Sequence, residues 1–315
     1  MNTARPPAFK KNRNGGFTLI ELCVVIATVA VLAVLLLPAL AATHPDSQAF
    51  QCMENQRQLI LGWQMYAEDN NSLLPPNDYP YLTAFATASA SARNAMKNWV
   101  AGTMESPFDV ATANSWELTD PHTLLSPYIT NAAPYHCPAD NYIDVFAVHR
   151  VHPRSVSMNS AVGTRWNSSS SYAGGSTAPP LGSVVGGGWL PGAAYNDSQT
   201  TWLTYGKMSS FTRPGPANTF VIIDENPLAI NDGSIAISAV ATTGNTYLIE
   251  FPAGNHNGAA GISFADGHVI IHKWLDSRTY TVTLAQHGGG GNPTGLQAPD
   301  DPDCFYLAPI TSARR

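Results

Sequence analysis

Charged residues are scarce in this 315-residue chain, where they make up 12% of the total, about half of the usual fraction. The basic ones are also unevenly spread, because Arg5, Lys10, Lys11 and Arg13 all fall within residues 1–16. The remainder holds 12 basic and 22 acidic residues, a net charge of −10. This balance argues against nucleic acid as a partner, since binding to phosphates requires clusters of Lys and Arg.

Signatures of common enzymes are also missing. The chain has no Walker loop, no HExxH pair and no dinucleotide-binding fingerprint. His287 is followed by four glycines, as in an esterase oxyanion loop, but no G-x-S-x-G nucleophile elbow accompanies it. We therefore expect no catalytic residues and no enzyme activity, and we reject an esterase.

Cysteines number only four, and one of them, Cys23, lies inside an apolar run. Cys52, Cys137 and Cys304 remain for the rest of the chain. Three is an odd number, so at most one internal disulfide forms there, and the count alone leaves its two members open.

One long apolar run is present, over residues 17–37, and its only ionisable groups are Glu21 and the thiol of Cys23. A bilayer core of about 30 Å needs roughly 20 helical residues, so the run predicts a transmembrane helix over 17–42. The basic residues before it place the N-terminus in the cytoplasm and residues 43–315 in the periplasm. The alternative is a secretory signal peptide cut before Ala42. Two features argue against a signal peptide. The run is longer than the usual apolar region of ~7–15 residues, and it contains a carboxylate, for which such a region has no use.

The residues from Lys10 to Glu21, KKNRNGGFTLIE, resemble the leader of type IV prepilins and type II secretion pseudopilins. The resemblance implies that prepilin peptidase cuts between Gly16 and Phe17 and methylates Phe17. It also implies that Glu21 pairs with the N-terminal amine of a neighbouring subunit during assembly, and a buried carboxylate is tolerable when it meets such a cation. Pro38 falls where many pilin helices carry a proline that bends them.

The region after the apolar run predicts an α+β domain. Pro45-Asp46-Ser47 predicts a break and a fresh N-cap, followed by an amphipathic helix over 48–70. Its apolar stripe consists of Cys52, Leu59, Ile60, Trp63, Tyr66 and Ala67. Short strands are predicted at 97–101, 219–224, 246–251, 261–265 and 268–274, and a variable insertion at 160–215. The expected fold is pilin-like, with a long N-terminal transmembrane helix that continues into the amphipathic helix, which packs on an antiparallel β-sheet with large loops.

A hairpin is expected over 255–275. Asp266-Gly267 predicts a two-residue turn that pairs Phe264 with Val269 and Ile262 with Ile271. Nine residues separate His256 from this turn.

The spacing resembles the H-x9-DG signature of a large subfamily of prepilin-like proteins, those with the domain of unknown function numbered 1559. Cys52-x-x-Asn55-x-x-Gln58 and Cys137-Pro138-Ala139-Asp140 agree with that resemblance. It favours a disulfide between Cys52 and Cys137, with Cys304 as the rival partner for either. If a disulfide stabilises by lowering the chain entropy of the unfolded state, one that closes a loop of this length contributes about 4 kcal/mol to stability.

Two groups of residues carry metal-binding side chains. For His256, Asp266 and His268, imidazole plus carboxylate is reasonable zinc chemistry, but a third ligand is needed. A turn already explains Asp266-Gly267. We therefore prefer a structural role, in which His256 caps a loop, and expect no metal there.

The second group is Asp300, Asp301 and Asp303, which are weak candidates for calcium, as in the C-terminal loop of the major pseudopilins that the chain resembles. A solvated acidic tail is the preferred interpretation, and no other cofactor is expected.

These observations predict a structural subunit that prepilin peptidase processes at the inner membrane and that assembles with other pilin or pseudopilin subunits. The alternative is a single-pass, membrane-tethered periplasmic module that binds a glycan or polymer and does not polymerise. Its candidate contacts are the aromatic residues Trp189, Tyr195, Trp202 and Tyr205.

Overall fold

A computed structural model of the chain describes residues 18–77, 97–101, 104, 118–143, 151–165, 182–192, 195–196, 200–282 and 296–315, without the side chains of 33–47. Gly16, Phe17, the side chain of Pro38 and residues 166–181, 193–194 and 197–199 of the predicted insertion lie outside the described residues. The chain divides into two compact units, Met1–Asp46 and Ser47–Arg315, which we describe separately.

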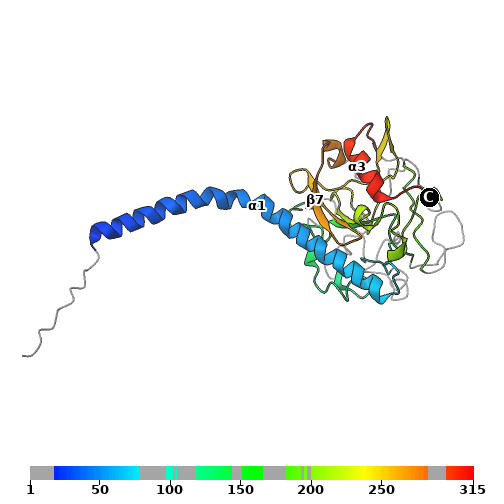
Figure 1. Ribbon diagram of the computed structural model, residues 1–315, viewed down its shortest axis with the longest axis horizontal. Helices are drawn as coiled ribbons and strands as arrows, with labels where there is room; N and C mark the ends of the chain where they lie inside the picture. The colour runs from blue at the N-terminus through cyan, green and yellow to red at the C-terminus, as the bar shows by residue number, and fades with distance from the viewer. Residues whose placement is uncertain are drawn as a thin grey trace, which may run out of the picture. The chain divides into compact units, whose positions relative to one another are not determined.

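The first helix, α1 (Leu19–Asp69), begins in the first unit (Figure 1). Among the described residues no helix is both long and apolar enough to cross a membrane. This finding corrects the expected pilin-like fold, in which a transmembrane helix spans 17–42, and leaves the single-pass inner-membrane placement without support. The expected helix break at Pro45-Asp46-Ser47 is also wrong, because α1 continues through these residues.

In the second unit, the C-terminal part of α1 packs on the sheet through the predicted stripe. All six of its apolar residues are buried, as the three- and four-residue spacing predicted: Cys52, Leu59, Ile60, Trp63, Tyr66 and Ala67. The helix ends at Asp69, and Asn71 and Ser72 follow it with positive φ angles of 56° and 65°. The amphipathic pattern therefore placed this helix and its buried face correctly.

The main sheet has five strands in the order β3-β1-β2-β6-β7. Their bounds are β1 (Val156–Asn159), β2 (Phe220–Asp224), β3 (Ser234–Ile235), β6 (Ala259–Phe264) and β7 (Val269–Lys273). The expectation of an antiparallel sheet is wrong, because β3 pairs with β1 in parallel and the sheet is mixed. Residues 225–233 reverse the chain after β2, so β3 runs antiparallel to β2 but lies on the far side of β1.

A second, three-stranded sheet has the order β4-β5-β8. It is formed by β4 (Ala241–Thr242), β5 (Asn245–Leu248) and β8 (Leu296–Gln297). The predicted strand at 97–101 does not form, and within it Asn98 forms an isolated β-bridge with Thr123.

Both faces of the main sheet are covered. Ile222 of β2 belongs to the buried cluster that contains Trp63 of α1. Ile262 of β6 belongs to a different cluster, which contains Leu307 of the C-terminal helix α3 (Pro302–Thr311). Figure 1 shows α3 in red and the light-blue end of α1, with β7 in orange. The second unit is therefore layered, with a helix on each face of the sheet.

The β6–β7 hairpin has a different register from the predicted one. Ser263 pairs with Val269 and Ile262 with Ile270, which shifts the alignment by one residue. The reason is the turn: a two-residue turn of this type needs positive φ at both central positions, and of the two only Gly267 has it, at 97°. The strands are joined instead by a three-residue loop, closed by the N–H of Phe264, which donates to the carbonyl of His268.

Candidate metal centre

Four buried side chains with metal-binding donors converge in the second unit. Cys52 comes from α1, and Cys137 follows the short 3-10 helix η2 (Ala133–Tyr135). Asp224 is the last residue of β2, and His256 lies in the loop before β6. One donor atom from each lies within 4.8 Å of the other three. Elements far apart in the sequence therefore meet at one point.

The contacts inside this cluster are short and polar. The Cys52 thiol donates to Asp224 Oδ2 at 3.1 Å, and Cys137 Sγ lies 3.2 Å from His256 Nε2. His256 Nε2 lies 4.0 Å from Asp224 Oδ2, with both side chains almost fully buried. Two thiols, an imidazole and a carboxylate are thus held together away from water.

Neighbouring groups fix the carboxylate of Asp224. Its Oδ1 accepts a hydrogen bond from Gln56 Nε2 at 2.9 Å, and its Oδ2 accepts one from the Gly261 N–H at 2.8 Å. Gln56 lies four residues after Cys52 and therefore on the same face of α1. A Cβ at Gly261 would come within 2.7 Å of Gln56 Nε2, so the close approach of β6 to α1 requires glycine at this position.

The loop that carries Cys137 is fixed in a similar way. Asn55 of α1 donates to the carbonyl of His136 at 3.1 Å. The N–H of Cys137 donates to Ser155 Oγ at 2.6 Å. Asn55 lies three residues after Cys52, so one helix face supplies a donor residue and the groups that hold two others.

Burial and hydrogen bonding change the acidity of these groups. Burial raises the pKa of Asp224, and the hydrogen bonds from Gly261 and Cys52 act in the opposite direction. The contacts with the Cys52 thiol and with His256 lower the pKa of Cys137 to about 7. The contact with Cys137 and burial raise the pKa of Cys52. A thiol with a pKa near 7 is partly thiolate at neutral pH, which is the form that binds metals.

The structure brings Cys52 and Cys137 together as free cysteines. Their proximity is what the expected disulfide requires, and the disulfide itself stays a prediction. Cys304 lies elsewhere, in α3, where its thiol is 3.8 Å from the carbonyl of Tyr247. It is therefore not beside either of the other two.

The residues of the H-x9-DG signature lie in two different places, Asp266 in the hairpin turn and His256 in the buried cluster. Asp266 Oδ1 accepts a hydrogen bond from the N–H of His268 at 3.1 Å and lies 2.6 Å from its Nδ1, both within the hairpin turn. His256 instead lies in the buried cluster, although a role as a loop cap was expected from its position in the sequence. Asp224 was not predicted as a site residue, because a single carboxylate at the end of an apolar strand carries no motif.

The three acidic residues near the C-terminus bind protein donors. Asp301 caps α3 by accepting the N–H of Asp303, and Asp303 accepts the N–H groups of Leu275 and Asp276. Asp300, which is exposed, accepts the N–H of Gly244. Asp301 and Asp303 are fully buried, so the preferred interpretation as a solvated tail is wrong for these two. Burial is possible because backbone donors replace water. Calcium binding here stays a prediction.

Glu21 has a partner within its own chain. Its Oε2 accepts hydrogen bonds from the N–H and the hydroxyl of Thr18, at 2.8 and 2.7 Å, and its N–H donates to the Thr18 hydroxyl at 3.3 Å. This is a capping box, which satisfies the first N–H groups of a helix. The T-x-x-E spacing could have identified it from the sequence.

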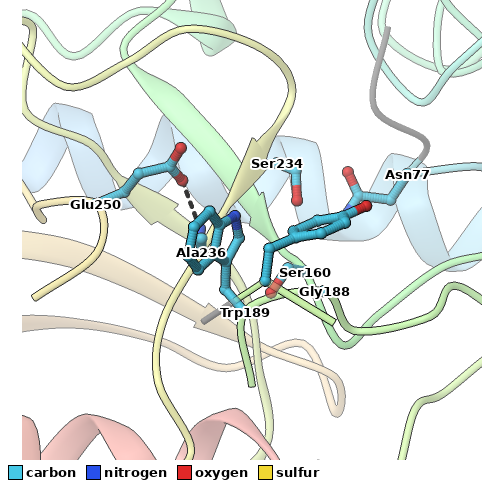
Figure 2. A pocket seen from close by; sticks show the side chains of 8 residues that line it. Asn77, Ser160, Gly188, Trp189, Ser234, Ala236 and Glu250 are labelled. Carbon is cyan, nitrogen blue, oxygen red and sulfur yellow. Dashed lines mark hydrogen bonds between the residues drawn. The ribbon is translucent and has the colours of Figure 1, made fainter. Parts of the chain in front are cut away.

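A pocket lies beside two of the aromatic residues that were proposed as ligand contacts. Trp189 and Tyr195 make an edge-on contact with ring centres 5.5 Å apart. They line a pocket with Asn77, Ser160, Gly188, Ser234, Ala236 and Glu250 (Figure 2). The dashed line in Figure 2 marks the hydrogen bond from the Ala236 N–H to Glu250. Trp202 and Tyr205 are buried and do not line it.

Comparison with known proteins gives no match to a protein family, to a curated protein or to a solved structure. Arguments about function therefore rest on the residues of this chain.

Proposed function

We propose that this protein is a prepilin-like structural subunit. Prepilin peptidase removes residues 1–16, and the processed chain assembles with other copies or related subunits in a pilus or a type II secretion pseudopilus. The resemblance of residues 10–21 to prepilin leaders supports the processing step. Support for assembly comes from the surface of the first part of α1.

The observation that carries the proposal is the exposure of apolar side chains between Leu19 and Leu32. Nine large ones are each between 47% and 78% exposed: Leu19, Ile20, Leu22, Val24, Val25, Ile26, Val29, Val31 and Leu32. They lie on every side of the helix, and each square ångström removed from water is worth about 25 cal/mol. A contiguous surface of this kind needs a covering partner. The same segment of neighbouring subunits offers one, because helices with apolar residues all round can surround one another.

Glu21 fits this assembly as the polar group of an otherwise apolar contact. Within the chain, Glu21 accepts the hydrogen bonds of Thr18 through its Oε2 atom. A carboxylate has about four acceptor positions, so the group can also accept the N-terminal amine of a neighbour. In an apolar surrounding, a carboxylate is stable when a cation pairs with it, and the amine of a processed Phe17 supplies that cation.

The test separates the charge of Glu21 from its role as a helix cap. In Glu21→Gln the side-chain oxygen still accepts the Thr18 bonds, but the negative charge is lost. In the matched control Thr18→Ala the charge stays and the hydroxyl of the cap is lost. We expect Glu21→Gln to lower the amount of subunit in the isolated filament fraction at least tenfold, while Thr18→Ala assembles. Equal assembly by both variants and the unaltered chain would refute the pairing.

The pocket beside Trp189 supports a second candidate function, as a module that binds a polar ligand such as a glycan. Among the described residues, the buried Asn77 Oδ1 and Ser160 Oγ that line this pocket have no hydrogen-bond partner. An aromatic face next to unsatisfied polar groups suits a sugar ring. Tryptophan fluorescence during titration with chitotetraose and cellotetraose tests it. Binding that is lost in Trp189→Ala and kept in Trp202→Ala would favour this function, and an unchanged spectrum would reject it for these sugars.

A further inference from the structure

The donors of Cys52, Cys137, Asp224 and His256 have the spacing of a tetrahedral metal site. Bonds of about 2.0–2.3 Å from zinc to nitrogen, oxygen and sulfur place neighbouring ligand atoms about 3.3–3.8 Å apart. The measured separations of 3.1, 3.2 and 4.0 Å surround this range, and all four donors lie within 4.8 Å of one another. Small side-chain movements are therefore enough to place an ion among them.

The donor types select zinc among the common ions. Thiolate and imidazole are preferred ligands of Zn²⁺, whereas calcium and magnesium take oxygen ligands almost exclusively. Four protein donors complete a tetrahedron, and all four residues are buried. A closed set of four is typical of structural zinc sites, while catalytic sites keep one position for water.

The surroundings of the cluster support a cation. Asp224 is fully buried, and its ion-pair partner among the described residues is His256, at 4.0 Å. Gln56 and the Gly261 N–H orient its carboxylate, as partners outside the ligand shell do in metal sites. Hydrogen bonds offset only part of the cost of burying a carboxylate charge, so an ion held by all four donors would stabilise this part of the molecule.

We propose that Cys52, Cys137, Asp224 and His256 bind one structural zinc ion. The two thiols release their protons on binding, and the ion joins α1, the Cys137 loop, the end of β2 and the loop before β6. Its role is to hold the amphipathic end of α1 on the sheet. This site does not depend on the proposed function, and it replaces the expected disulfide, because a cystine cannot supply two thiolates.

The first experiment measures metal and thiols in the full chain, purified from its own cells without reductant or chelator. We expect about one zinc per chain by elemental analysis, and an intact mass without the loss of two hydrogens that a disulfide causes. Replacing zinc by Co²⁺ should produce sulfur-to-cobalt absorption and the visible bands of a tetrahedral ion. A disulfide between Cys52 and Cys137, or less than one zinc per ten chains, would overturn the proposal.

Variants locate the ion. Cys137→Ser and His256→Ala should abolish the cobalt bands. Gln56→Leu removes one of the two groups that orient Asp224 and leaves all four ligands in place, so it should weaken zinc binding about 10–100-fold. Cys304→Ser is the control, since it removes a buried thiol outside the cluster. Circular dichroism identifies variants that fail to fold. If they do, Gln56→Leu and the cobalt spectrum of the unaltered chain still decide. Cobalt bands retained in Cys137→Ser but lost in Cys304→Ser would overturn the assignment.

Discussion

At the scale of single residues, carboxylates with raised pKa values link the stability of the folded protein to pH. Glu225 is fully buried near the fully buried Arg154, which donates to the carbonyls of Val156 and Asp232. Glu250 is half-buried and lines the pocket beside Trp189. Burial and the charge of Asp232 raise the pKa of Glu250 from 4.5 to about 8. Burial likewise raises the pKa of Glu225. The folded protein therefore holds protons that the unfolded chain releases.

This proton uptake predicts a pH dependence of stability. Because the folded pKa of Glu250 is the higher one, its contribution is fully present below about pH 4.5 and is lost as the pH rises through about 8. We expect the free energy of unfolding to fall between pH 5 and pH 8. In Glu250→Gln, which stays neutral, the fall should be smaller by at least about 1.4 kcal/mol, the equivalent of one pKa unit. Urea titrations at the two pH values measure it, and an identical fall in both proteins would contradict the assignment.

Gly261 is the residue that lets β6 approach α1. In Gly261→Ala the new methyl group would lie 2.7 Å from Gln56 Nε2 and 3.1 Å from Asp224 Oδ2. We expect a loss of about 1–3 kcal/mol in the free energy of unfolding, the usual cost of overpacking. The double variant Gly261→Ala with Gln56→Ala removes the clashing amide and should recover part of that loss. Additive losses would show that the two residues are not in contact.

Sequence reasoning identified part of the cluster and missed the rest. Cys52, Cys137 and His256 stood in recognisable motifs, although no local pattern indicated that the three would meet. Asp224 could not be found, since its role depends on which helix face covers the end of β2. Contacts between distant segments are set by the tertiary fold and leave little trace in local sequence.

Among the elements, those with a strong periodic pattern were predicted best. The stripe from Cys52 to Ala67 fixed the buried face of α1, because six positions agree with one helical period. The β6–β7 register was wrong because it depends on one φ angle in the turn. The two-residue strand β3, which makes the sheet mixed, is too short to carry any pattern.

Helix α3 provides a test at the scale of elements. Asp301 caps it and is fully buried, while the neighbouring Asp300 is exposed. We expect Asp301→Ala to lower the free energy of unfolding by about 0.5–2 kcal/mol, the cost of losing an N-cap. Asp300→Ala should cost less, because its bond to Gly244 lies at the surface. Thermal unfolding of both variants measures the difference, and equal losses would show that the cap contributes nothing specific.

At the scale of the whole molecule, the second unit contains four converging donors, and the first unit carries a helical segment with exposed apolar side chains. The two claims are independent, since the donors lie within the second unit and the exposed residues within the first. The leader over residues 1–16 stays a prediction, and the predicted fold with a transmembrane helix over 17–42 was wrong, since no helix among the described residues is long and apolar enough to cross a membrane.

The most direct test of the proposed function is the N-terminus of the mature protein, produced together with its prepilin peptidase. N-terminal sequencing and intact mass identify the first residue and its modification. If the proposed function is correct, the mature chain begins at Phe17 and carries one additional methyl group. A chain that begins at Met1 or at Ala42 would contradict it.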